Sequence, residues 1–109
     1  MPSYLGEFEY AVLLAVLHLK DDAYAVPVRE LIAERTGREI ARGALYTSLE
    51  RLEGKGCVSS TMRDPGEDAR AGRARRYFTL TPKGLAALRA THDALKNLTT
   101  GLETLLDRS

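Results

Sequence analysis

The chain has no tryptophan, a single cysteine and no large excess of either charge, and these shortages exclude several classes of protein. Cys57 has no second thiol to pair with, so the sequence predicts neither an internal disulfide nor a thiolate metal cluster. The longest apolar run, residues 10–19, falls well short of the ~20 residues that span a bilayer and lacks the flanks of a signal peptide. We therefore expect a soluble, cytoplasmic protein.

The composition that is present is typical of one folded domain. Of the 109 residues, 44% are hydrophobic and 28% are charged, as in ordinary soluble proteins. The formal net charge is +1, but residues 35–76 hold ten basic and six acidic residues while the rest of the chain is acidic. This asymmetry favours one face that meets a polyanion, although a solvated face gives the same bias.

Three helices are predicted in the first half of the chain. Apolar residues recur at three- and four-residue steps over residues 5–19, the period of an amphipathic helix. A second helix begins near Pro27, which is tolerated in a first helical turn, and ends at Thr36-Gly37. A third follows over residues 42–55. Its predicted inner face consists of Leu45, Leu49 and Leu52.

The hydrophobic period then changes to that of strands. Residues 57–63 and 75–80 read as a β-hairpin joined by a polar loop with two glycines and a proline. Val58 and Met62 share one face of the first strand, and Phe78 and Leu80 point inward from the second. Thr81-Pro82 next opens a last helix, because threonine caps free N–H groups and proline suits the first turn.

The last predicted helix carries leucines at heptad spacing. Leu88, Leu95 and Leu102 are seven residues apart, and Thr91, Leu98 and Leu105 follow each by three. A short lone helix is marginal in water, and Gly101 within it costs a further ~1 kcal/mol relative to alanine. We expect this seam to pair with the same helix, or the first helix, of a second subunit; the alternative is that it folds back on its own core. The dimerisation candidates are Phe8, Leu88, Leu95, Leu98, Leu102 and Leu105.

The predicted elements follow the order of a winged helix-turn-helix: two short helices joined by a tight turn, and then a hairpin with a basic loop. The expected fold class is mainly α with a small β-hairpin, with a DNA-binding domain at residues 1–80 and a C-terminal dimerisation helix at 81–109. In this architecture the second helix of the pair enters the major groove and the hairpin, or wing, touches the DNA backbone or minor groove. The DNA-binding candidates are Arg42, Gly43, Tyr46, Thr47 and Arg51 on the third helix, and Arg70, Arg73 and Arg75 on the wing.

The predicted residues of the third helix are of types that are suited to DNA binding. Arginine neutralises phosphates or bonds guanine edges, the Tyr46 hydroxyl donates, and Thr47 bonds a base or meets a thymine methyl group. Gly43 lets the backbone approach closely, where free N–H groups favour a phosphate. Two alternatives stay open: Tyr46 packs at the core margin, and Arg51 pairs with a neighbouring acid, Glu50 or Glu53.

Two stretches carry a family resemblance. Residues 43–56 contain Gly-x-Leu-Tyr and Leu-x-x-Leu-x-x-x-Gly, and residues 75–84 contain Arg-Tyr-x-x-Leu-Thr-x-x-Gly. Together they resemble the PadR family of bacterial transcriptional regulators, and the resemblance runs from about Leu5 to the C-terminus. It implies a homodimeric winged-helix repressor with a C-terminal dimerisation helix. The family's recognition tyrosine then falls on Tyr46 and its wing arginines on Arg73 and Arg75.

The chain departs from the family pattern in three ways. Ala41 stands where many relatives have a serine or threonine cap, one helix follows the wing as in short-tailed members, and no tryptophan is present to stack a flat drug. The resemblance therefore names no small-molecule effector and leaves its existence open. A ligand pocket beside Phe8 and Val12 competes with the simpler expectation that both residues are core.

Enzyme chemistry has little support in the sequence. His18 and His92 lie far apart, no cysteine–histidine cluster has metal-ligand spacing, and no glycine-rich phosphate loop is present. We expect no enzymatic activity and no cofactor. The expected partners are double-stranded DNA, at a pseudo-palindromic operator, and a second copy of the chain. The alternative is a winged helix used for protein–protein interaction, with its arginines merely solvated.

Overall fold

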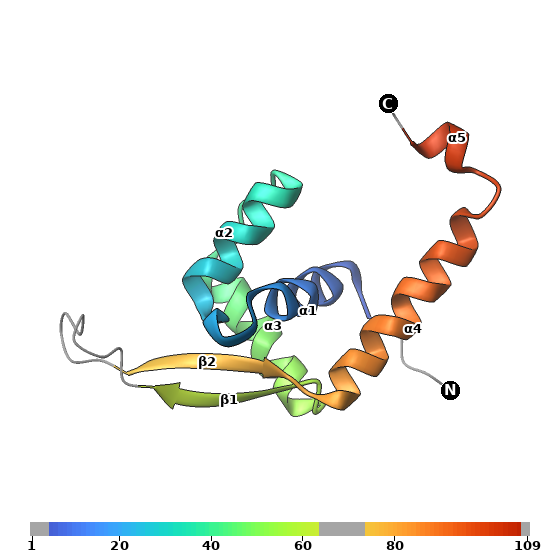
Figure 1. The fold of residues 1–109 in the computed structure, drawn as a ribbon. Helices are drawn as coiled ribbons and strands as arrows, with labels where there is room; N and C mark the ends of the chain where they lie inside the picture. Colours follow the sequence, from blue (N-terminus) through green and yellow to red (C-terminus); the bar gives the residue numbers. More distant parts are fainter. Residues whose placement is uncertain (1–4, 64–73, 108–109) are drawn as a thin grey trace.

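The computed structural model describes residues 5–63 and 74–107 (Figure 1). The elements follow the order α1 (Glu7–Leu19), the 3-10 turn η1 (Lys20–Asp22), α2 (Ala25–Thr36), α3 (Arg42–Gly54), β1 (Val58–Arg63), β2 (Arg75–Leu80), α4 (Pro82–Thr99) and α5 (Glu103–Leu106). The predicted fold class, mainly α with a small hairpin, is confirmed. In the described ranges, no helix is long and apolar enough to cross a membrane.

Local signals fix the boundaries of the helices before the hairpin. Helix α2 begins two residues earlier than predicted, with Pro27 inside its first turn, and ends at Gly37. Gly37 has a φ of 73°, a left-handed conformation that glycine adopts without a side-chain clash, and its N–H bonds the Ala33 carbonyl. Helix α3 begins at Arg42 as predicted and ends at Gly54. The turn between α2 and α3 is therefore short, as the predicted architecture requires.

Helix α1 lies at the centre of the fold. It packs against α2, α3, β2 and α4, so each of these elements buries its apolar face on the same helix (Figure 1). The predicted inner face of α3 is confirmed, because Leu45, Leu49 and Leu52 are completely buried. Phe78 is buried from the β2 side. Burying these side chains removes apolar surface from water and holds α3 in a fixed orientation.

The hairpin is antiparallel, with a register that runs from Val58 opposite Leu80 to Arg63 opposite Arg75. The Phe78 N–H also donates to the Ala23 carbonyl at 2.8 Å, which ties β2 to the segment before α2. Met62 shares the face of Val58 but is 62% exposed. Its cross-strand partner is Arg76 rather than an apolar residue, so this end of the hairpin lies outside the core.

The first half of α4 belongs to the core. The Thr81 hydroxyl accepts from the Gly84 N–H at 3.0 Å and Pro82 lies in the first turn, which confirms the predicted start of the helix. Leu88 is 3% exposed, and the buried Thr91 hydroxyl accepts from the Leu5 N–H at 3.0 Å. Leu88 therefore packs within its own chain and offers no surface to a partner, in contrast to the sequence expectation.

The prediction of one uninterrupted helix through Leu105 is wrong. Helix α4 ends at Thr99, and Gly101 has a φ of 94° before the single turn of α5. The hydroxyls of Thr99 and Thr100 both donate to the Lys96 carbonyl at 3.0 Å, which occupies one of the last acceptors of α4. Glycine reaches this positive φ without steric cost, so the chain leaves the helix at this point.

Beyond Thr91 the chain extends away from the other helices, and we call residues 92–107 the C-terminal arm (Figure 1). The radius of gyration is 15.7 Å, compared with ~13 Å for a compact domain of about this length. The arm carries exposed leucines, between 46% and 80% accessible: Leu95, Leu98, Leu102, Leu105 and Leu106. Five exposed leucines within one sixteen-residue segment are unusual on a monomer and typical of an interaction site.

Candidate nucleic-acid interface

The outer face of α3 presents most of the predicted DNA-binding residues to solvent. Arg42, Gly43, Thr47 and Arg51 are exposed, while the leucines on the opposite face are buried. This arrangement follows from the helical period, because leucines at steps of three and four leave the other side free. The structure therefore brings these four residues together on one helix face.

The start of α3 has no side-chain cap. Ala41 is the N-cap residue and cannot accept a hydrogen bond, and the first helical bond runs from the Leu45 N–H to the Ala41 carbonyl. The N–H groups of residues 42–44 precede that bond and remain available to a ligand. A Cβ atom at Gly43 would meet nothing within 4 Å, so the backbone is open to approach. Such a helix start favours an anion, including a phosphate.

Tyr46 lies at the border between the core and this face. Its ring is partly buried against the core, and the Arg42 guanidinium lies 5.7 Å from the ring centroid. The predicted core-margin alternative therefore describes the ring. Stacking on Tyr46 also restricts where Arg42 can point, because cation and ring face attract each other.

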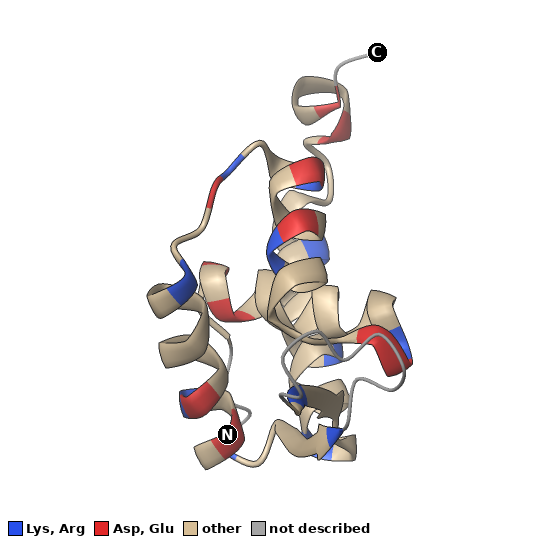
Figure 2. Cartoon of the chain, turned by 90° about the vertical axis from the view of Figure 1, so that its left-hand side faces the viewer, with Lys and Arg blue, Asp and Glu red and all other residues tan. Residues whose placement is uncertain are grey.

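The hairpin strands carry basic charges and no acidic ones (Figure 2). Arg63 and Arg75 are cross-strand partners, and their guanidinium groups lie over tyrosine rings: Arg63 over Tyr77 at 4.0 Å and Arg75 over Tyr24 at 4.7 Å. The centroids of the two tyrosine rings are 5.2 Å apart. We call these four residues the wing base. They place two positive charges over two neighbouring aromatic rings, one of which, Tyr24, directly precedes α2.

Sequence reasoning found Arg75 in this cluster but missed Arg63, Tyr24 and Tyr77. The hairpin register was the available signal, because strands of equal length place Arg63 directly opposite Arg75. The predicted wing residues Arg70 and Arg73 lie outside the described residues.

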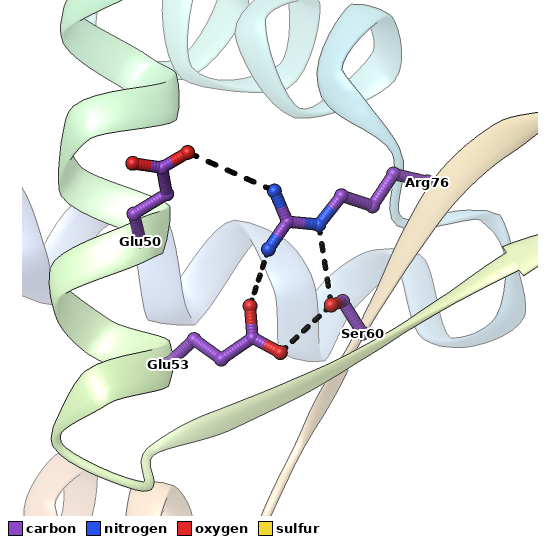
Figure 3. Close-up of polar contacts among 4 residues, drawn as sticks. All are labelled: Glu50, Glu53, Ser60 and Arg76. Carbon is purple, nitrogen blue, oxygen red and sulfur yellow. Dashed lines mark hydrogen bonds and ion pairs between the residues drawn. The ribbon is translucent and has the colours of Figure 1, made fainter.

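Arg76 joins the wing to α3 through a network of four residues (Figure 3). Its Nη2 donates to Glu53 Oε1, its Nε donates to the Ser60 hydroxyl at 3.2 Å, and Ser60 donates to Glu53 Oε2 at 2.7 Å. The Nη1 atom lies 3.9 Å from Glu50 Oε1. The acids expected as partners of Arg51 thus pair with Arg76. Among the described residues, Arg51 forms no ion pair.

The network also lowers the pKa of Glu53. The hydrogen bond from Ser60 is the main cause, and the hydrogen bond and charge of Arg76 act in the same direction against partial burial. A carboxyl group whose pKa is lowered on folding stabilises the fold above its ordinary pKa. That contribution is lost as the pH falls through the lowered pKa.

We expect Glu53→Gln to reduce the pH dependence of stability in acid. Between about pH 5 and about pH 3 the melting temperature of the unchanged protein should fall, and that of the variant should fall less. A pH dependence will remain, because the pKa of Glu9 is also lowered, mainly by its hydrogen bond from Lys55. Thermal unfolding followed by circular dichroism at a series of pH values measures the difference. Glu34→Gln, on the exposed surface of α2, is the matched control, and parallel curves for Glu53→Gln and the unchanged protein would contradict the assignment.

The predicted dimerisation residues separate into two groups. Phe8 is partly buried against the core with the Arg38 guanidinium 5.4 Å from its ring, and Leu88 is core. Val12 is completely buried, which favours the core alternative over a ligand pocket there. The other four leucines, together with Leu106, are the exposed apolar side chains of the arm. Leu106 was not predicted, because the heptad positions were assigned on one continuous helix.

Comparisons with known proteins agree with this geometry. The model of the transcriptional regulator PadR-like family matches residues 13–90. A transcriptional regulator of Mycobacterium tuberculosis is 41% identical over 64 residues, which are 59% of this chain and 55% of that relative. The chain thus matches about half the length of that curated relative.

Solved structures extend the likeness to nearly the whole chain. A PadR-like transcription factor from Bacteroides fragilis has a TM-score of 0.71 at 26% identity, covering 90% of this chain and 88% of that one. A PadR-like transcriptional regulator from Bacillus cereus has a TM-score of 0.72 at 19% identity, covering 94% and 93%. The fold is thus shared with these proteins over nearly the whole chain.

Proposed function

Because the chain belongs to the PadR-like family of transcriptional regulators and is therefore a DNA-binding regulator, we propose that it is a repressor that binds a pseudo-palindromic operator as a homodimer. The observation that carries the proposal is the open start of α3, where uncapped N–H groups, Arg42, Gly43 and Thr47 share one exposed face. An α-helix with such a face fits the major groove.

Each subunit would place α3 in a major groove. The N–H groups at its start would bond a phosphate, Thr47 would meet a base edge, and Arg51 would neutralise the backbone. The wing base would approach the neighbouring phosphates, with Arg63 and Arg75 held over their tyrosine rings. Phosphate contacts of this kind fix the register of the protein on DNA, and base contacts supply the sequence preference.

The two-fold symmetry of a homodimer sets the form of the operator. Two identical recognition helices read inverted half-sites, whose centres would lie about one helical turn, ~34–36 Å, apart. The exposed leucines of the arm support this arrangement, since they are apolar side chains that a second copy of the chain would remove from water. Repression would follow from occupying promoter DNA. Regulation would act by changing the distance or tilt between the two recognition helices, because the arm would connect them.

We expect tight binding to DNA upstream of the protein's own gene, and binding that weakens steeply as salt rises from ~50 to ~200 mM. Each phosphate contact releases counterions, so Arg51→Gln should make the negative slope of log affinity against log salt shallower by about 1. It should also weaken binding to all DNA sequences alike. Fluorescence anisotropy with labelled operator and scrambled DNA measures both quantities.

Arg89→Gln is the matched control, since it removes the same charge from the exposed surface of α4. Its salt slope should equal that of the unchanged protein. Equal, weak binding to both DNAs would contradict the proposal. Salt-independent association with another protein would support the protein-interaction module instead.

A further inference from the structure

Arg76 differs from the other basic residues of the wing in how its guanidinium group is used. Two of its three nitrogen atoms donate hydrogen bonds within the fold, Nε to Ser60 and Nη2 to Glu53, and Nη1 lies at ion-pair distance, 3.9 Å, from Glu50 Oε1 (Figure 3). Its Cζ atom also lies 5.0 Å from the centroid of the buried Phe78 ring. Arg63 and Arg75 have aromatic supports but no ion pair with a described acidic residue. Among the described residues, Arg76 is therefore the wing arginine whose guanidinium group is engaged by acidic side chains of the fold.

The network spans the two parts of the protein that must meet DNA together. Glu50 and Glu53 belong to α3, Ser60 to β1 and Arg76 to β2. The Glu53 carboxylate receives one hydrogen bond on each oxygen, and these donors come from both strands of the hairpin. A forked, charge-assisted arrangement of this kind fixes direction as well as distance. The angle between the hairpin and α3 is consequently held by polar contacts at this point.

That angle matters only when both parts bind at once. A recognition helix and a wing that are already set in their binding orientation lose less freedom on association, which strengthens the complex that uses both. Scrambled DNA is held mainly by phosphate contacts and needs no such register. A device that fixes the angle should therefore affect operator binding more than binding to scrambled DNA.

We propose that Arg76 is a positioning residue for operator recognition, which holds the wing against α3 through Glu53 and Ser60 and does not itself contact phosphate. The proposal rests on the operator binding proposed above. It assigns Glu53 a role that its charge alone would not suggest, because a carboxylate on a DNA-binding helix is otherwise expected to repel the phosphates.

Arg76→Gln and Glu53→Gln break the network from opposite sides and provide the test. Each should weaken operator binding by about tenfold and change scrambled-DNA binding by less than about twofold, because pre-organisation is lost and phosphate contacts are kept. The salt slope of Arg76→Gln should equal that of the unchanged protein, in contrast to Arg51→Gln. Glu53→Gln separates the two explanations more clearly. This substitution removes a negative charge near DNA, which alone would strengthen binding, and is still expected to weaken operator binding.

Glu50→Gln is the matched control, because it removes the same charge from the same helix but breaks only the longest contact of the network. Its operator affinity should not fall. Anisotropy titrations are run well below the melting temperature of each variant, so that a change in stability does not alter the measured affinity. Arg76→Lys keeps the charge but not the fork and should recover only part of the operator affinity.

Three outcomes would overturn the positioning role. Equal losses on operator and scrambled DNA with a salt slope lower by about 1 would make Arg76 a phosphate ligand. A lower melting temperature with unchanged operator affinity would make the network purely structural. Equal losses of operator affinity in Glu50→Gln and Glu53→Gln would show that the hydrogen bonds of Glu53 have no special role. If the unchanged protein itself has no preference for the operator, the proposed function falls, and this role falls with it.

Discussion

Replacing Gly84 by alanine is expected to lower the free energy of unfolding by about 3 kcal/mol, although alanine is the better helix former by about 1 kcal/mol. Gly84 lies in the first turn of α4 and is buried. A Cβ atom on it would lie 2.1 Å from the Cys57 carbonyl oxygen and 2.8 Å from Leu80 Cδ1. No Cβ atom approaches a carbonyl oxygen so closely, so α4 would have to move away from the hairpin.

That movement is resisted by hydrogen bonds on both sides of the contact. The Cys57 carbonyl accepts from the Thr81 N–H at 3.0 Å, and the Thr81 hydroxyl donates to the Gly56 carbonyl at 2.6 Å. The same hydroxyl accepts from the Gly84 N–H and caps the helix. Shifting α4 therefore costs the cap as well as the packing, which explains why the glycine that ends the Arg-Tyr-x-x-Leu-Thr-x-x-Gly motif is needed here.

Gly54→Ala is the matched control for this prediction. Gly54 is also helical, at the end of α3, but a Cβ atom there would meet nothing within 4 Å. This substitution should leave stability unchanged or raise it by up to about 1 kcal/mol. Urea denaturation followed by circular dichroism measures both variants. Equal stability of Gly84→Ala and the unchanged protein would show that α4 and the hairpin are less tightly joined than the structure indicates.

Much of the fold could be predicted because its signals are local. The leucine spacing of α3, the glycine after α2 and the Thr81-Pro82 start of α4 each depend on a few neighbouring residues. The end of α4 was missed because the leucine spacing continues across it. Thr99, Thr100 and Gly101 were the contrary signal, since two β-branched residues and a glycine disfavour a helix. The spacing of leucines predicts a shared face only for residues that belong to the same continuous helix.

The candidate site was predictable to a similar degree. The exposed face of α3 follows from the helical period: Arg42, Gly43, Thr47 and Arg51 are exposed there, while Tyr46 is partly buried at the border with the core. The partner of Glu53 did not follow from the sequence, because it depends on how β2 crosses α3 in space. Sequence proximity pointed to Arg51, two residues before Glu53, whereas the actual partner, Arg76, is 23 residues away from Glu53 in the chain.

The largest effect on DNA binding is expected from two substitutions in the arm, far from α3. Leu95→Asp combined with Leu98→Asp should make the protein monomeric and weaken operator binding by about 100- to 1000-fold, because a monomer cannot hold both half-sites at once. Each exposed leucine buried in a dimer contributes up to about 1.5–3 kcal/mol, and a charge in its place must lose its hydration. The fold should survive, since the buried residues of α4 are Gly84, Leu88 and Thr91, which are all left unchanged.

Charge alone could weaken DNA binding, so the control must change the net charge equally. Lys96→Gln combined with Asn97→Asp makes the protein more negative by the same two units and leaves the leucines in place. This pair should stay dimeric and keep most of its operator affinity. Sedimentation equilibrium gives the oligomeric state and anisotropy gives the affinity. A leucine variant that remains dimeric would exclude the arm as the interface. A monomeric variant with unchanged operator affinity would instead mean that each subunit reads DNA alone, and that regulation cannot act through the spacing of two recognition helices.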